Sequence, residues 1–485
     1  MEQLTPQEWA REQVRRAPSF AVATAIMVMT LIISMFITFS SARPRLALPP
    51  VQSEIREEEP VVLEKIPEQV LPDEPDIKPP EDAPLVFDED VSPVDAPIED
   101  VTVDIDLTED LSSDVVEPTD PIPMELTKKL ATIGTSPGSG GFRGRLGNRT
   151  AGGRRRAARR YGMPRGTDKD ILAALRWLKK VQEDDGSWNG KRWGGSAAGP
   201  AASTGLALLA FLGYGCTDRE PAEFANTVKK AVNYLIAKQQ TKGAKKGWFG
   251  ERMYGQGICT MALAEAYGMM RKRDIKEAAQ AGLGYILRAQ PSDGGFGYTG
   301  AGNDTSVTGF QIQAIKSAMA CDLNVPKAAR DKVEAFLQRC INADGSTSYN
   351  AARSPGAGGT GTPSMTAASL TGRLFMGHKR TDADVQAQAK WLATKNYVAI
   401  GKKADNLYTV YYLSLSMFNM GGAYWKNWNE AFNIALRAKQ EKKGPNAGSW
   451  PPGGFRYGSH GGRIYSTTMA CLALEVYWRY TLETR

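Results

Sequence analysis

Residues 177–188 read Trp177-Leu-Lys-Lys-Val-Gln182-Glu-Asp-Asp-Gly-Ser-Trp188, and later parts of the chain repeat this pattern. An aromatic residue lies near a helix end, a glutamine follows five positions later, and an Asp-Gly turn leads to a second aromatic residue. The best-preserved copy runs from Tyr285 through Gln290 to Phe296. Looser copies occupy 234–249, 336–346, 391–396 and 440–450. Successive copies lie roughly 45 to 57 residues apart, a spacing typical of arrays of supersecondary units.

Two kinds of helix alternate along these repeats. Before each turn, apolar residues recur at helical spacing, as in Ile171, Leu175 and Leu178, which predicts an amphipathic helix. Thr167 is the predicted N-cap of the first one. After each turn comes a helix that is apolar on nearly every side, which is typical of a helix buried between neighbours. These predicted inner helices are 203–212, 254–270, 305–320, 364–376, 407–420 and 465–480.

Together the repeats resemble those of squalene-hopene cyclases, class II terpene cyclases and protein prenyltransferase β-subunits, over residues 167–485. The resemblance implies an all-α fold, an (α/α)6 toroid of about six helix pairs. Six inner helices would ring a central cavity, and six outer helices would surround them. The alternation of helices comes from the periodicity, whereas the closure of the ring is implied by the resemblance.

The chain before the repeats divides by composition into four segments. Residues 1–16 form a short tail, and residues 17–42 are long and apolar enough to predict a single transmembrane anchor. A cleavable signal peptide is the rival interpretation. More arginines precede the apolar segment than follow it, which predicts a cytoplasmic tail and an extracytoplasmic repeat domain at the cell (inner) membrane. Residues 43–137 are acidic and Pro-rich, and residues 138–166 form a Gly/Arg-rich basic junction.

Charge is distributed unevenly between these segments. Residues 51–125 hold 25 acidic and 3 basic residues, which predicts a disordered tether. Residues Arg143–Arg165 contain nine arginines and no acidic residue. This basic stretch could pack on the acidic segment or on the domain, or it could bind an anionic lipid or envelope polymer. Nucleic acid is disfavoured, because the predicted location is extracytoplasmic and the stretch has no aromatic interleaving for base stacking.

The cyclase resemblance directs attention to the start of the third inner helix. Squalene-hopene cyclases protonate an alkene with the middle acid of an Asp-x-Asp-Asp motif, and the corresponding run here is Ala301-Gly302-Asn303-Asp304-Thr305. The proton donor would therefore be Asn303, and an amide has no proton acidic enough for this chemistry. Asp304 is either a remaining acid or the N-cap of the helix.

The prenyltransferase resemblance directs attention to a zinc site. Those enzymes hold zinc with an Asp, a Cys two residues later and a distant His, and the matching positions here are Asp405, Leu407 and Ser466. Only one of three protein ligands is kept, so no metal and no cofactor is predicted. His460, in a Gly-rich loop, is either an acid or base at the cavity mouth or a merely exposed residue. The candidate catalytic residues are thus Asp304, Asp405 and His460.

Aromatic residues recur at or near the starts of the inner helices. Together with one amide, they are the candidate ligand-binding residues: Tyr254, Asn303, Phe310, Tyr408, Tyr411, Tyr412 and Tyr465. Cyclases use such aromatic faces to stabilise carbocations; alternatively, these side chains fill a packed centre. We therefore expect either a non-catalytic domain that binds an isoprenoid-like lipid or a peptide, or a divergent triterpene or polyprenyl cyclase or prenyltransferase. The five cysteines, an odd number in apolar surroundings, are expected to be buried core residues.

Overall fold

The computed structural model describes residues 146–196, 199–299, 302–350 and 361–480. The predicted membrane anchor and tether, and the first part of the basic junction, lie outside these residues. Within the described ranges, no helix is both long and apolar enough to cross a membrane.

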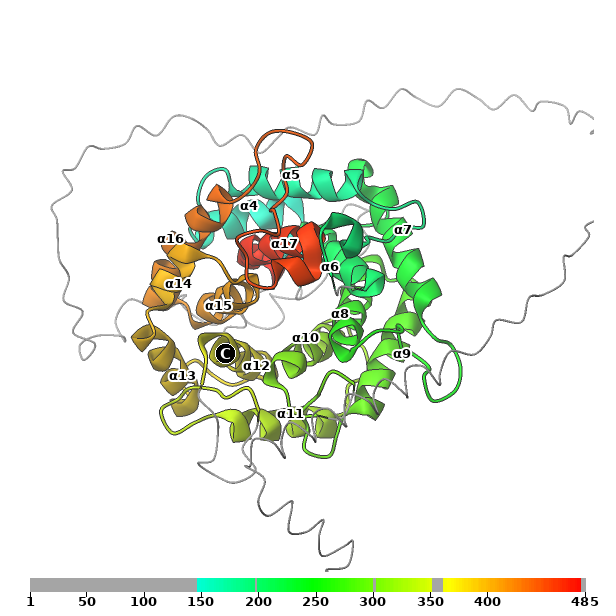
Figure 1. Cartoon of the computed structure of the whole chain (residues 1–485). Helices are drawn as coiled ribbons and strands as arrows, with labels where there is room; N and C mark the ends of the chain where they lie inside the picture. Colours follow the sequence, from blue (N-terminus) through cyan, green and yellow to red (C-terminus); the bar gives the residue numbers. More distant parts are fainter. Residues whose placement is uncertain (1–145, 197–198, 300–301, 351–360, 481–485) are drawn as a thin grey trace, which may run out of the picture. The chain divides into compact units, whose positions relative to one another are not determined.

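The described helices form two concentric layers around a common centre (Figure 1). The inner layer comprises α6 (Pro200–Gly213), α8 (Met253–Met270), α10 (Thr305–Ala320), α12 (Pro363–Met376), α15 (Leu407–Met420) and α17 (Gly458–Leu474). The outer layer comprises α5 (Thr167–Lys180), α7 (Ala222–Lys238), α9 (Arg273–Ala289), α11 (Lys327–Cys340), α13 (Ala383–Thr394) and α16 (Gly422–Ala438). Each inner helix packs against the next, and α17 packs against α6, so the ring closes. The predicted toroid is confirmed.

The two layers differ in which residues they bury. Outer helix α9 buries one stripe, which includes Ile275, Leu283 and Ile286, and leaves its other face in solvent. Inner helix α8 buries nearly every residue along its length, polar side chains included. The sequence patterns predicted this difference, because an amphipathic helix covers one side of a core whereas a uniformly apolar helix lies between neighbours.

The repeated glutamine and glycine connect neighbouring outer helices. Gln182 donates from Nε2 to the carbonyl oxygens of Gly186 in its own turn and Thr227 on α7, both at 3.0 Å. Gln440 makes the same pair of bonds at the last turn. Gly186 has φ 90°, and a side chain there would collide with the backbone carbonyl of Lys230 on α7. The motif is therefore structural: it fixes the distance between successive outer helices.

The predicted helix boundaries at the two ends of the repeats differ from the structure. Thr167 is the first helical residue of α5 and not its N-cap, because Gly166, with φ 82°, holds the cap position. The last inner helix, expected over 465–480, ends at Leu474, and its first turns are interrupted by Gly462, with φ 70°. A separate short helix, α18 (Val476–Arg479), follows it.

Part of the basic junction belongs to the helical domain. From Leu146 onward it forms a 3₁₀ turn, η1 (Gly147–Arg149), and a helix, α4 (Ala151–Arg160), and both pack against α18. Arg149 is fully buried. The guanidinium of Arg154 lies 4.0 Å from the ring centroid of Tyr214 at the end of α6. The folded domain therefore extends further toward the N-terminus than the repeats themselves. The remaining short elements are η2 (Gly190–Trp193) and α14 (Tyr397–Lys403).

Candidate functional site

The functional candidates gather at one end of the ring. Because outer and inner helices alternate around the ring, the inner helices run in the same direction and their N-termini meet at one end. We call this the N-terminal end of the ring. Unpaired backbone N–H groups give such helix starts a partial positive charge, which favours anionic or electron-rich groups nearby.

Five of the predicted ligand-binding residues form one aromatic cluster. Phe310 on α10 lies at its centre, with its ring centroid 5.7 Å from that of Tyr254 on α8. The centroids of Tyr408 and Tyr412 on α15 lie 6.3 and 6.0 Å from that of Phe310. Tyr411 stacks on Phe310 with the centroids 6.4 Å apart. The cluster thus connects three inner helices. Of these, α8 and α10 are neighbours in the ring, whereas α15 is a neighbour of neither.

The cluster fills the ring at the depth of Phe310. The residues Phe310, Tyr411 and Tyr412 are only 4%, 0% and 1% exposed, so almost all of their surface is packed against other residues. Tyr254 and Tyr408, one helical turn nearer to the N-terminal end, are half-buried. Of the two expectations for these residues, the packed centre describes the deeper three, whereas the outer two keep an accessible surface.

Asp304 caps helix α10. Its Oδ1 accepts hydrogen bonds from the backbone N–H groups of Ser306 and Val307, at 2.8 and 3.0 Å. The same oxygen accepts a bond from the hydroxyl of Ser306 at 2.6 Å, and the hydroxyl of Tyr254 donates to Ser306 Oγ at 2.6 Å. The interpretation of Asp304 as an N-cap is confirmed. Its carboxylate is committed to three donors in the protein.

The tyrosine hydroxyls of the cluster form hydrogen bonds with polar groups on α10. Tyr411 donates to Oε1 of Gln313, and Gln313 donates from Nε2 to the hydroxyl of Tyr412 at 2.9 Å. Tyr408 donates to the backbone carbonyl of Ser306 at 3.2 Å. Burial raises the pKa of Tyr408, Tyr411 and Tyr412, so all three stay neutral over the physiological range. The cluster is therefore an uncharged aromatic surface and supplies no catalytic base.

The other predicted binding residues lie around this cluster. Asn303 is half-buried immediately before the cap of α10. Tyr465 is half-buried on α17, and no ring contact joins it to the cluster within the described part of the chain.

The remaining catalytic candidates are not brought together. Asp405 is half-buried and forms an ion pair with Lys403, at 2.8 Å. His460 is exposed, as its rival interpretation predicted, and its ring centroid lies 6.0 Å from that of Tyr457. Among the described residues, no three His, Cys, Asp or Glu side chains are arranged to hold a metal ion. Leu407, at the position where the resemblance to protein prenyltransferases places a zinc-binding cysteine, is fully buried among apolar residues.

All five cysteines are free and buried, as predicted. Burial raises the pKa of each thiol, to about 11 for Cys340 and about 12 for Cys321. A thiol with a raised pKa carries little thiolate at neutral pH, so these side chains are core residues and not nucleophiles.

Three exposed tyrosines at the same end were not predicted. Tyr298 and Tyr349, in loops that lead into α10 and toward α12, are 41% and 42% exposed, and Tyr457, at the start of α17, is 49% exposed. The hydroxyls of Tyr298 and Tyr349 lie 3.3 Å apart, and the ring of Tyr298 lies 5.5 Å from that of Tyr254. We call these three residues the aromatic rim. A sequence signal existed for two of them, since each follows the motif's turn by a few positions.

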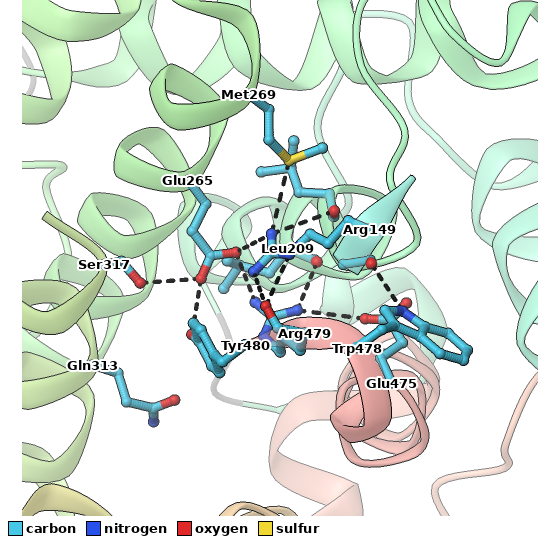
Figure 2. A network of polar contacts seen from close by, with 12 residues as sticks. Arg149, Leu209, Glu265, Met269, Gln313, Ser317, Glu475, Trp478, Arg479 and Tyr480 are labelled. Carbon is cyan, nitrogen blue, oxygen red and sulfur yellow. Dashed lines mark hydrogen bonds and ion pairs between the residues drawn. The ribbon is translucent and has the colours of Figure 1, made fainter. Parts of the chain in front are cut away.

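The opposite end of the ring is occupied by a buried ionic network (Figure 2). The carboxylate of Glu265 on α8 accepts hydrogen bonds from Arg149 at 2.8 Å and from Arg479 at 3.0 Å. Tyr480 and Ser317 donate to its second oxygen at 2.9 and 3.0 Å. Burial alone would raise the pKa of Glu265, but the two guanidinium groups outweigh it and hold the pKa below its usual value. Both arginines and Glu265 are completely buried, so this end presents no accessible charge from the network.

Comparisons with known proteins give one family match and distant matches to solved structures. The family described as the prenyltransferase alpha-alpha toroid domain matches residues 161–254 and 258–445, more than half of the chain. A search of curated proteins finds no significant match. Among solved structures, a cellobiose 2-epimerase from Spirochaeta thermophila matches with a TM-score of 0.50 and 11% identity, covering 67% of this chain and 98% of the epimerase. A type II terpene cyclase from Scytonema matches with a TM-score of 0.44 and 15% identity, covering 64% of this chain and 98% of the cyclase.

Likenesses this distant concern the fold alone, since the same toroid carries unrelated chemistries. The family match is a different kind of finding, because it extends over most of the repeats from which the toroid was predicted. The chain belongs to the prenyltransferase alpha-alpha toroid domain family.

Proposed function

We propose that the toroid is a non-catalytic binding domain that takes an extended peptide segment at the N-terminal end of the ring. The observation that carries this proposal is the contrast in depth within the aromatic residues. Phe310, Tyr411 and Tyr412 fill the centre, whereas the aromatic rim lies at 41% to 49% exposure on the loops around it. A ligand would therefore lie across this end and would not enter the ring.

The filled centre argues against an enclosed small-molecule substrate. Small-molecule sites are concave and bury most of their ligand's surface. Conversion of a long polyprene would also need an acid inside the ring. Asn303 stands where the resemblance to squalene-hopene cyclases places the proton donor, and Asp304 already accepts three hydrogen bonds within the protein.

The composition of the rim suits a protein partner. Tyrosine and arginine are enriched among the residues that dominate protein interfaces. The guanidinium of Arg252 lies 5.9 Å from the ring centroid of Tyr298, and that of Arg456 lies 5.2 Å from the centroid of Tyr457. Both arginines are exposed. Together with the inner-helix N-termini they favour a peptide that carries carboxylates beside its apolar side chains.

One observation favours a second candidate, an isoprenoid-like lipid. Tyr254 and Tyr408 are half-buried beside Phe310 and offer an apolar surface that a short prenyl chain could cover. If such a lipid is also converted, the domain is a divergent triterpene or polyprenyl cyclase or prenyltransferase. The two candidates differ in the residues that the ligand contacts. A prenyl chain would cover Tyr408, whereas a peptide bound at the aromatic rim would depend mainly on Tyr298 and Tyr349.

The location that the sequence predicts forms part of the proposal. An anchor at 17–42 would hold the domain at the outer face of the cell membrane, on the tether at 43–137. Alkaline phosphatase fused after Arg485 should be active in bacterial cells, and the fusion should remain in the membrane after a carbonate wash. A fusion that is inactive, or that appears in the soluble fraction, would contradict this location.

The binding proposal can be tested by selection with the full-length protein. A random peptide library displayed on phage is panned against it, and the enriched peptides are synthesised and their affinities measured by fluorescence anisotropy. We expect the enriched sequences to combine aromatic or aliphatic residues with acidic ones, and their affinity to fall in a Tyr298→Ser/Tyr349→Ser variant. Ile434, 64% exposed on outer helix α16, provides the matched control Ile434→Ser, which should bind normally.

A turnover assay separates the enzyme class from the binding class. The same protein is incubated with squalene and with farnesyl diphosphate, and the products are analysed by gas chromatography. We expect no product. A product that depends on Asp304 would contradict the proposed function in favour of the divergent cyclase or transferase.

A further inference from the structure

Helix α4 carries a row of exposed arginines on one face. Arg155, Arg156, Arg159 and Arg160 are exposed, while Ala157 and Ala158 on the other face are buried. The four positions are spaced one and four residues apart, so a helix brings them onto a single side. This face is separate from the N-terminal end of the ring, because α4 packs against α18 beyond the last inner helix.

This row is unfavourable for an isolated helix. Arg155 with Arg159, and Arg156 with Arg160, are like charges at i,i+4, which destabilise a helix by a few tenths of a kcal/mol for each pair. None of the four forms an ion pair with another residue in the described ranges. By contrast, Arg154, on the inner side of the helix, donates to the carbonyl oxygens of Arg149 and Tyr214. The exposed four therefore form an uncompensated positive surface.

We propose that the exposed face of α4 is the docking surface for the acidic segment of the same chain, residues 51–125. The charges are complementary, since this segment holds 25 acidic and 3 basic residues whereas the arginine stretch contains no acid. The covalent connection is short, because the segment ends at Glu125 and α4 begins at Ala151. Such proximity gives the segment a high effective concentration at the helix, which a free anion would have to exceed.

Docking would hold the tether at the end of the ring opposite to the aromatic rim. The tether would then be shorter in its docked state than as a free coil, and salt would lengthen it by screening the arginines. An anionic membrane surface is the competing occupant of the same face. It is an outcome of the test below.

Energy transfer within the full-length protein tests this docking. One dye is placed in the acidic segment through Ser92→Cys and the other at the start of α4 through Ala151→Cys, an exposed position. The native cysteines are all buried, so labelling is selective for the two introduced thiols. A relaxed coil between the two positions would span about 40 Å. Docking should bring the two dyes closer and so give a higher transfer efficiency than the relaxed coil would give. High salt should return the transfer efficiency to the coil value.

Two variants of equal charge change identify the docking surface. Replacing Arg155, Arg156, Arg159 and Arg160 by Gln should lower the transfer to the coil value. The control replaces by Gln one exposed lysine on each of four outer helices, Lys229, Lys276, Lys332 and Lys390, and should keep the high transfer. Equal transfer in the two variants, or coil-like transfer in the parent protein, would overturn the proposal. If the parent instead binds vesicles containing phosphatidylglycerol and the arginine variant does not, the occupant is a membrane surface and the proposal is also overturned.

Discussion

Arg149 donates two hydrogen bonds to the backbone carbonyl oxygen of Arg479, from Nε at 3.0 Å and from Nη2 at 2.9 Å, across 330 positions of the chain. These bonds join the first and last turns of the described domain. Both side chains also hold Glu265, so the closure of the ring depends on one buried ionic network as well as on the contact between α17 and α6 (Figure 2). The segment before the repeats is thus part of the fold.

Arg149→Met should destabilise the domain by about 3–5 kcal/mol, because it leaves Glu265 with one of its two buried cations. Urea unfolding of the full-length protein, followed by tryptophan fluorescence, measures the loss. Arg155→Met, an exposed change on the adjoining helix, should stay within about 0.5 kcal/mol of the parent. Equal losses for the two variants would show that the buried network contributes nothing specific.

Glu475 should make stability depend on pH. Burial raises the pKa of its carboxyl group to about 8, and Oε1 has no hydrogen-bond partner in the described part of the chain. Between the unfolded value of about 4.3 and the folded value, the native state keeps a proton that the unfolded chain has released. The free energy of unfolding should therefore fall as the pH rises from about 5 to 8 and change little above that range.

Glu475→Gln should remove this dependence. The variant should match the parent near pH 5 and be the more stable protein near pH 9, as measured by urea unfolding at each pH. Glu183→Gln, a change at a surface ion pair with Arg192, is the matched control and should leave the pH dependence in place. Parallel pH profiles for the parent and the Glu475 variant would exclude Glu475 as the titrating group.

The alternation of helices was predictable because its cause is local and repeated. Gln182, Gly186 and the aromatic residues around them have counterparts at most of the turns, and the amphipathic and uniformly apolar helices follow one another at their spacing. The closure of these helices into a ring was expected from the family resemblance alone. The grouping of Tyr254 with Tyr408 was also accessible, since both lie at inner-helix starts. In these cases a residue's position along its helix determines its place in the ring.

The rest depends on distances across the ring, which a linear pattern does not contain. Nothing local distinguishes the buried Arg149 from the exposed arginines that follow it, because only the packing of α18 determines its surroundings. Likewise, the rings of Phe310 on α10 and Tyr411 on α15 stack only because the closed ring lets side chains of these two non-neighbouring helices reach each other. Local pattern can place an aromatic residue at a helix start, but it cannot tell a cavity wall from a packed centre.

Gly186→Ala should be more destabilising than its left-handed backbone alone requires. An alanine at positive φ costs about 1–2 kcal/mol, and at Gly186 its Cβ would also meet the carbonyl of Lys230. Gly243 also has positive φ, 68°, but has free space around it. Gly243→Ala should therefore cost only the backbone strain, and Gly186→Ala roughly 3 kcal/mol in total. Thermal or urea unfolding that ranks the two variants equally would contradict the role of the turn glycine.

Asp304 should behave as a cap and not as an acid. Asp304→Asn keeps an N-cap oxygen and should change stability little, whereas Asp304→Ala should cost about 1 kcal/mol. Urea unfolding measures both changes in stability. Neither substitution should change the affinity for the selected peptides. A large loss of stability in the Asn variant would show that the charge of Asp304 matters more than its cap geometry.

The most direct measurement is the affinity of one library-selected peptide for the parent protein and for two variants, by fluorescence anisotropy. We predict that Tyr298→Ser/Tyr349→Ser raises Kd at least about tenfold, or about 1.4 kcal/mol, and that Ile434→Ser leaves Kd unchanged. Circular dichroism should show both variants folded. Unchanged affinity in the rim variant would place the ligand elsewhere and contradict the assignment of the N-terminal end of the ring as the binding site.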